Sequence, residues 1–133
     1  LQRLVDELGL GSSVVLAGAT RDVAGELDAA SIFVLSSRHE GFPMTILEAM
    51  SRGVPVVSFD CPHGPGEMIT NEREGLLVPP GDVDGLGDAL GRLMDDPVAR
   101  CRMGDHALRT SARYDRDEVH GAWSRLLCDL VPD

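Results

Sequence analysis

Residues 32–59 read IFVLSSRHEGFPMTILEAMSRGVPVVSF, and this stretch determines the kind of fold that we expect. Its opening residues, Ile32–Leu35, are continuously apolar, which is typical of a strand buried on both faces of a parallel sheet. A polar loop follows, and a helix is predicted over Pro43–Arg52, because proline suits a first helical turn and Gly53 suits the position just after a helix. Another apolar strand, Val54–Phe59, completes a strand–helix–strand unit.

The alternation of apolar strands and helices continues on both sides of this stretch. Further strands are predicted at Ser13–Ala17 and Gly75–Val78. Helices are predicted at Leu1–Leu8, Val23–Ala30, Val83–Met94, Pro97–Arg113 and Arg116–Leu130. Strands and helices in this order indicate an α/β protein with a doubly wound parallel sheet, covered by helices on both faces. Ligands of such sheets bind beyond the carboxyl ends of the strands, and Ser36–Thr45 lies in that location.

Two of the predicted helices have apolar faces that we expect to be packed. Asp22 is a candidate N-cap for the Val23–Ala30 helix, which would turn Val23, Leu27 and Ala30 inward. In the last helix, Trp123 begins an amphipathic stripe that continues through Leu126, Leu127 and Leu130. We interpret this stripe as a packing surface and not as a binding site.

The composition excludes several classes of function. The chain of 133 residues has a net charge of −10 from 12 basic and 22 acidic side chains, and every basic residue is Arg. An acidic chain is a poor partner for nucleic acid, whose phosphates require a basic face. The absence of Lys excludes a Schiff-base enzyme and a P-loop lysine within this chain. No apolar run is long enough to predict a membrane span.

The cysteines and the other metal-ligand residues predict no metal site. Cys61, Cys101 and Cys128 are widely spaced and odd in number, which favours reduced thiols of a cytoplasmic protein over disulfides. No cluster of His, Cys and Asp has the spacing of metal ligands, so we expect no tightly bound metal.

Two carboxylates, Glu40 and Glu48, bracket the start of the Pro43–Arg52 helix. No Ser, Thr, Asp or Asn precedes this helix, so the amides of Met44 and Thr45 are left without a side-chain cap. An uncapped helix start at the ligand end of a sheet is a good site for a diphosphate. Carboxylates accept hydrogen bonds from sugar and ribose hydroxyls, and Gly41 would allow the backbone to approach a ligand.

The simpler alternative is that both glutamates are solvated surface charges, since a pair at this spacing is common by chance. The roles of two histidines, His39 and His63, also have two interpretations each. His39 could touch a ligand or lie exposed in its loop, and His63 could line the same cleft or play no part. Glu67 is best explained as an acidic residue that favours the start of a short helix.

A wider set of motifs resembles glycosyltransferase family 4, also called glycosyl transferases group 1. The matching segments are Ser36–Pro43, Glu48–Val57, Gly64–Ile69 and Glu74–Asp82. The glutamate pair with its Gly-Phe-Pro, at a fixed distance from the Gly-Val-Pro that begins the next strand, is specific. The resemblance runs from the first helix to at least Leu93. It implies the Rossmann-like C-terminal half of a GT-B fold, incomplete at its N-terminus, over residues 1–133.

The resemblance also implies roles for individual residues. Glu40 would be catalytic, binding and orienting the donor sugar, and Glu48 would bind the nucleoside ribose. The residues that would hold the sugar and diphosphate are Gly41, Phe42, Pro43, Met44 and Thr45. The loop that would receive the base contains Gly18, Thr20 and Arg21. Members of the family are retaining and metal-independent; the resemblance therefore implies a nucleotide-diphosphate sugar as donor substrate and no cofactor.

The chain departs from the family pattern before Leu1. It has no Arg…Lys-Gly element to contact the diphosphate, and the first strand, first helix and second strand of the domain are not found. The N-terminal domain, which would bind a glycan, lipid-linked or small-molecule acceptor, is also outside this sequence. We therefore expect these residues alone to be inactive. The intact enzyme would be cytoplasmic, with a peripheral position at the inner membrane face as a further expectation.

Two alternatives stay open beside the glycosyltransferase. One is a non-catalytic module that binds a nucleotide sugar, and the other is part of a GT-B sugar epimerase, which shares the fold and the ligand. The sequence that precedes Leu1 would discriminate them, because an Arg…Lys-Gly pair and a second Rossmann domain would indicate the transferase.

Overall fold

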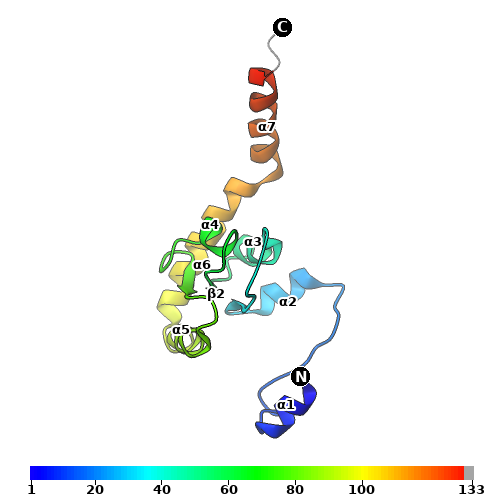
Figure 1. Cartoon of the computed structure of the whole chain (residues 1–133), viewed down its shortest axis with the longest axis vertical. Helices are drawn as coiled ribbons and strands as arrows, with labels where there is room; N and C mark the ends of the chain where they lie inside the picture. Colours follow the sequence, from blue (N-terminus) through cyan, green and yellow to red (C-terminus); the bar gives the residue numbers. More distant parts are fainter. Residues whose placement is uncertain (131–133) are drawn as a thin grey trace.

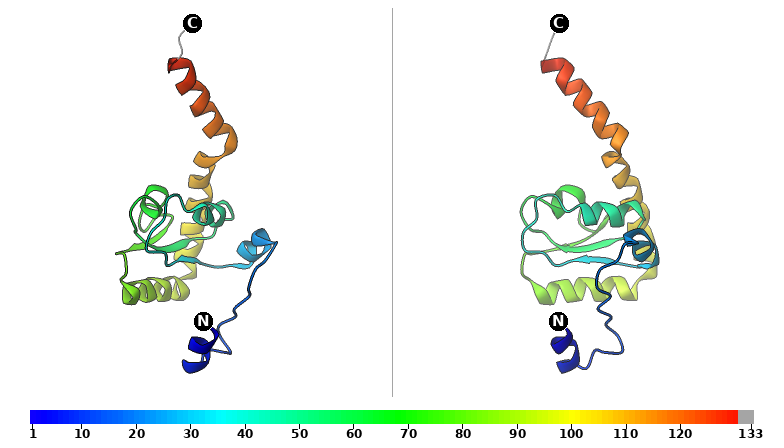
Figure 2. Two further views of the ribbon diagram at one scale, coloured as in Figure 1. Left: turned by 45° about the vertical axis from the view of Figure 1, so that its right-hand side comes forward. Right: turned by 90° about the vertical axis from the view of Figure 1, so that its right-hand side faces the viewer.

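The computed structural model describes residues 1–130, which form a small parallel sheet with helices on both sides (Figures 1 and 2). The strands are β1 (Phe33–Leu35), β2 (Val56–Phe59) and β3 (Gly75–Val78). The helices are α1 (Gln2–Glu7), α2 (Val23–Ala29), α3 (Met44–Ser51), α4 (Pro65–Met68), α5 (Val83–Asp95), α6 (Pro97–Ser111) and α7 (Arg116–Leu130), with a 3-10 turn η1 (Ala112–Tyr114). These elements confirm the expected α/β fold class with a parallel sheet.

The sheet has the order β1–β2–β3, and both strand pairs are parallel. In the central strand, Val56 is paired with Phe33 on one side and with Gly75 on the other. All residues of β2 are buried, which explains why Val56, Val57 and Phe59 are apolar without alternation. The one polar residue, Ser58, satisfies its hydroxyl by donating to the carbonyl of Phe59 at 2.9 Å. The carboxyl ends of the strands therefore lie at one edge, where the loops after Leu35, Phe59 and Val78 meet.

The two faces of the sheet carry separate hydrophobic cores, because successive side chains of a strand point to opposite faces. Val56 belongs to the core formed with α3, which includes Ile46 and Met50, both with no exposed surface. Val57 belongs to the other core, formed with α5 and α6 around Leu93 and Met103. Figure 2 shows α3 and α5 on opposite sides of the strands. The sheet is thus covered as a doubly wound architecture requires.

The prediction of a strand at Ser13–Ala17 is wrong for this structure. Residues 14–20 form an extended connector without ladder pairing, in which Val15 is 85% exposed and Leu16 is 45% exposed. The connector joins α1 to α2, and α1 lies apart from the sheet (Figures 1 and 2). A strand needs a neighbour to receive its backbone hydrogen bonds, and no neighbouring strand lies beside the connector within residues 1–130.

Smaller expectations about helices also need correction. Val23 does not face inward but is 46% exposed, whereas Leu27 is buried as expected. Pro43 is the N-cap residue of α3 and not its first helical residue. The helix predicted over Pro97–Arg113 is α-helical only to Ser111, after which the chain tightens into η1.

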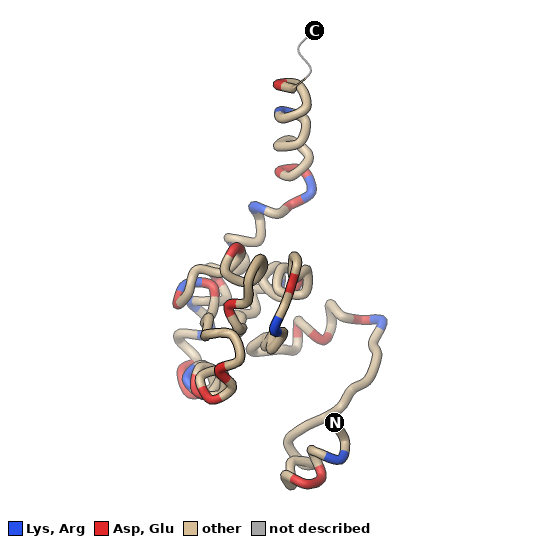
Figure 3. Tube along the Cα trace, viewed as in Figure 1, with Lys and Arg blue, Asp and Glu red and all other residues tan. Residues whose placement is uncertain are grey.

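The last helix, α7, projects away from the rest of the chain (Figure 1). None of its residues is buried, and Trp123 is 58% exposed, so the expected packing of its apolar stripe does not occur among residues 1–130. Acidic positions are spread over α1, α2, α5 and α7, with Arg interspersed (Figure 3). No helix of the described chain combines the length and the apolar character that crossing a membrane demands.

Candidate functional site

The start of α3 has the features that the sequence predicts for an anion site. Pro43 occupies the cap position, its backbone is non-helical, and no side chain caps the helix. Its carbonyl accepts a hydrogen bond from the amide of Ile46 at 2.9 Å. The amides of Met44 and Thr45 have no hydrogen-bond partner among residues 1–130, and both residues are exposed. These amides and the positive end of the helix dipole can therefore bind a negatively charged group.

Glu40 lies in the loop that precedes α3 and packs against a second loop. A Cβ atom at Gly64 would lie 3.1 Å from Cβ of Glu40 and 3.3 Å from Cδ of Pro43. A side chain at position 64 would push these neighbours back by a few tenths of an ångström, so Gly64 favours the close approach of the loops after β1 and β2. Glu40 is half-buried, and within the described part of the chain its carboxylate makes no hydrogen bond or ion pair. Its oxygens are available to a ligand.

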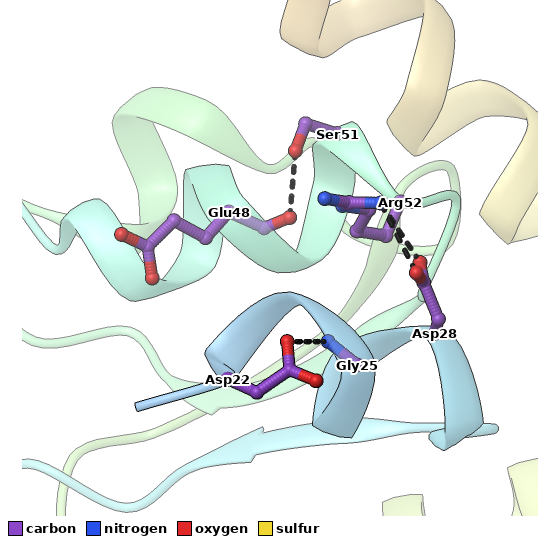
Figure 4. Close-up of polar contacts among 6 residues, drawn as sticks. All are labelled: Asp22, Gly25, Asp28, Glu48, Ser51 and Arg52. Carbon is purple, nitrogen blue, oxygen red and sulfur yellow. Dashed lines mark hydrogen bonds and ion pairs between the residues drawn. The ribbon is translucent and has the colours of Figure 1, made fainter. Parts of the chain in front are cut away.

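Glu48 follows on the second turn of α3 and is exposed. Its backbone carbonyl accepts a hydrogen bond from the Ser51 hydroxyl at 2.8 Å, and its side chain extends the other way, as Figure 4 shows. Arg52, just after this helix, contacts both carboxylate oxygens of Asp28 at 3.1 Å. This exposed ion pair links α2 to the end of α3, and α2 lies below the Glu48 side chain in Figure 4.

The segment predicted to receive a base immediately precedes α2. Gly18 adopts a left-handed conformation with φ 74°, and Gly18, Thr20 and Arg21 are all exposed. The Thr20 hydroxyl oxygen accepts from the amide of Asp22 at 3.0 Å, and Asp22 in turn caps α2 by accepting from the amide of Gly25. No hydrogen bond joins this segment to the Glu40–Glu48 segment in the described chain. The structure thus brings together the Glu40–Thr45 residues but leaves Gly18–Arg21 in the connector.

A hollow of about 560 Å³ lies where the loops after all three strands meet. It is lined by Arg38, His39, Pro62, Pro80 and Gly81. A neighbouring hollow of about 420 Å³ includes His63, whose φ of 59° is unusual for a residue other than glycine. Both histidines were candidates from the sequence, whereas Pro80 and Gly81 lie in the matching Glu74–Asp82 segment but had no predicted place in the site. They could have been predicted to line the site, because the parallel strand β3 ends at the same edge of the sheet as β1 and β2.

Among residues 1–130 there is no group of three or more His, Cys, Asp and Glu residues placed to hold a metal ion. The described cysteines are unpaired, and only Cys61 is buried. The groups that the candidate site offers to a ligand are the amides at the start of α3 and the carboxylates of Glu40 and Glu48.

The parallel sheet with helices on both faces defines a doubly wound α/β domain, and the exposed amides and two carboxylates at the carboxyl end of the sheet form a candidate polar site. Comparison with known proteins identifies the family to which this domain belongs. The chain belongs to the family of glycosyl transferases group 1, whose profile matches residues 1–96.

Two curated relatives cover nearly the whole chain. An exopolysaccharide phosphotransferase of Streptomyces coelicolor is 39% identical over 98% of this chain and 14% of its own length. A lipopolysaccharide core biosynthesis glycosyltransferase of Rhizobium meliloti is 37% identical over 92% of this chain and 36% of its own length. The chain thus spans roughly a seventh to a third of these proteins.

A solved structure supports the arrangement of the elements. A mutant of Staphylococcus aureus TarM, in complex with fondaparinux, α-GlcNAc-glycerol and UDP, is similar with a TM-score of 0.87 at 25% identity. The similarity covers 94% of this chain and 26% of TarM. With coverage this high, the shared arrangement extends beyond the three strands and includes most of the helices.

Proposed function

We propose that this chain is the donor-binding part of a glycosyltransferase that takes a glycosyl group from a nucleotide-diphosphate sugar. The observation that carries the proposal is the uncapped start of α3 between two carboxylates without partners, at the carboxyl end of the sheet. The family match and the UDP present in the TarM complex support it.

In the proposed site each group has a separate task. The amides of Met44 and Thr45 bind the diphosphate, and Glu48 accepts hydrogen bonds from the ribose hydroxyls. Glu40 accepts from hydroxyls of the donor sugar and orients its ring. Gly18, Thr20 and Arg21 contact the base.

The reaction exchanges one bond at the anomeric carbon for another. The bond from this carbon to the diphosphate oxygen breaks, a bond to an acceptor hydroxyl oxygen forms, and the hydroxyl proton is released as the nucleoside diphosphate departs. The positive end of α3 stabilises the negative charge that develops on the departing diphosphate. Glu40 stabilises the positive character of the sugar ring in the transition state. Following the resemblance, we propose that the anomeric configuration is retained and that no metal is required.

We further propose that residues 1–133 form part of a larger GT-B enzyme, whose N-terminal domain binds the acceptor. Within residues 1–130, β1 is paired on one side only, and the connector before α2 has no strand partner. Further strands preceding this chain would fit beside β1. A glycan, lipid-linked or small-molecule acceptor would bind to the N-terminal domain, facing the donor site across the cleft between the two domains.

The test uses the natural full-length protein that contains this chain. UDP-, GDP- and ADP-sugars are screened by calorimetry and for transfer, and Glu40→Gln is compared with Glu7→Gln on the exposed helix α1. We expect Glu40→Gln to lower kcat roughly 100- to 1000-fold, the scale of a lost electrostatic contact to a transition state, with little change in nucleotide affinity. A near-normal kcat would remove Glu40 from catalysis. Binding without transfer in the wild-type protein would instead favour the non-catalytic module.

A second candidate function is phosphotransfer, favoured by the name of the relative that is 39% identical. The released nucleotide distinguishes the two reactions. Glycosyl transfer releases a nucleoside diphosphate, whereas transfer of a sugar phosphate releases a nucleoside monophosphate. An epimerase would return the nucleotide with an altered sugar, which chromatography of the products would show.

A further inference from the structure

Tyr114 contacts the proposed donor loop from a distant part of the sequence. It is the last residue of η1, between α6 and α7, and its ring lies 6.0 Å from the ring of Phe42 with a tilt of 59°. Tilted aromatic pairs at this separation attract each other beyond the area they bury. Tyr114 is also half-buried against the core under α3. Phe42, by contrast, is 47% exposed, so its position depends on few neighbours.

The same residue holds the second loop of the site. The Tyr114 hydroxyl donates a hydrogen bond to the backbone carbonyl of Glu67 at 3.2 Å. Glu67 lies in α4, whose cap residue is Gly64, and Gly64 packs against Glu40 and Pro43. Tyr114 thus contacts both the loop after β1, through Phe42, and helix α4 after β2, through Glu67. These two segments in turn pack against each other where Gly64 meets Glu40.

A buried hydrogen bond anchors the helix that carries Tyr114. The hydroxyl of Thr110 in α6 donates to the carboxylate of Glu74 at 2.8 Å, and both residues are almost fully buried. The other Glu74 oxygen accepts from the amide of Thr70 at 2.9 Å. The last turn of α6 is therefore fixed to the segment before β3, which gives Tyr114 a rigid support.

We propose that Tyr114 is a positioning residue for donor binding. Its ring holds Phe42, and its hydroxyl holds α4, so that Glu40 and the amides after Pro43 keep the geometry that binds the diphosphate sugar. Tyr114 itself does not touch the donor. Because Tyr114 also marks the point where α7 departs, a displacement of α7 would be transmitted to the donor loop. This inference rests on the proposed function.

The test compares Tyr114→Leu with Tyr114→Phe in the natural full-length protein. The probe is the UDP-, GDP- or ADP-sugar that the wild-type protein binds. Loss of the ring contact should raise the donor Kd and KM roughly three- to tenfold, the range expected from an aromatic pair, with a smaller change in kcat. Tyr114→Phe retains the ring and should rescue most of this loss. Arg109→Gly, at an exposed position of α6 that does not line the hollow beside Glu48 and Tyr114, is the control for reduced helix stability and should leave the donor KM unchanged.

A double-mutant cycle identifies the partner. If Tyr114 acts through Phe42, the loss in Phe42→Leu/Tyr114→Leu should be smaller than the product of the two single losses. An unchanged donor KM in Tyr114→Leu, or a loss equal to that of Arg109→Gly, would overturn the positioning role. Strictly multiplicative losses would overturn it as well. If the wild-type protein bound none of the nucleotide sugars, the proposed function would be at fault, which is a separate result.

Discussion

Glu48 is an exposed carboxylate on α3, and no hydrogen bond or ion pair to its side chain occurs in residues 1–130. If it binds the ribose, Glu48→Ala should weaken nucleotide binding by about 1–3 kcal/mol, the scale of hydrogen bonds to a charged group. Calorimetry with the full-length protein measures this loss. Glu118→Ala, on the projecting helix α7, is a matched control. Unchanged affinity in Glu48→Ala would show that the ribose role is wrong.

Gly64 is the residue at which a single methyl group should disturb the site. The added carbon in Gly64→Ala would lie 3.1 Å from Cβ of Glu40, which is tighter than an ordinary contact between carbons. The donor loop must therefore move by a few tenths of an ångström, and we expect the donor KM to rise. Gly87→Ala in α5 is the control, because nothing lies within 4 Å of its added carbon. A Gly64→Ala enzyme with wild-type donor kinetics would contradict the proposed packing of the two loops.

Between elements, α6 packs tightly against the turn that ends α3. A Cβ atom at the buried Gly104 would collide with the carbonyl oxygen of Gly53, which itself adopts φ 69° after the helix. Gly104→Ala should therefore destabilise the fold by about 1–3 kcal/mol, the usual cost of overpacking. Gly91→Ala in α5 meets no neighbour and should instead stabilise its helix by about 0.5–1 kcal/mol. Denaturant unfolding of both variants would reveal the opposite signs.

The elements also show which features could be predicted from the sequence. The runs Ile32–Leu35 and Gly75–Val78 became strands because β2 lies between them and pairs with both. Ser13–Ala17 has the same apolar character but forms no strand, since pairing depends on a neighbour that its own sequence does not encode. The Glu40–Glu48 motif could be found because its parts are close in sequence. The role of Tyr114 could not, because it depends on where α6 ends and on how α6 crosses α3.

For the molecule as a whole, the unpaired side of β1 leads to a last prediction. Val34 in this strand is 39% exposed, and the separate connector leaves Val15 at 85% exposure. Unpaired strand edges and exposed apolar side chains favour association, and domains have a net stability of only about 5–15 kcal/mol. Residues 1–133 expressed alone should thus unfold at low temperature or aggregate, without transferring sugar. The natural full-length protein, in which additional strands would cover β1, should melt cooperatively.

Thermal unfolding and hydrogen exchange would compare the two forms. The amide of Phe33 already donates to the Pro55 carbonyl, so the next amide in the strand, that of Val34, points to the unpaired side of β1. The Val34 amide should exchange slowly only in the longer protein, where a further strand would accept its hydrogen bond. Amides of β2, which has neighbours on both sides, serve as the internal control. A cooperative melt of residues 1–133 together with sugar transfer would contradict the proposal, because it would mean that this sheet and this donor site are sufficient by themselves.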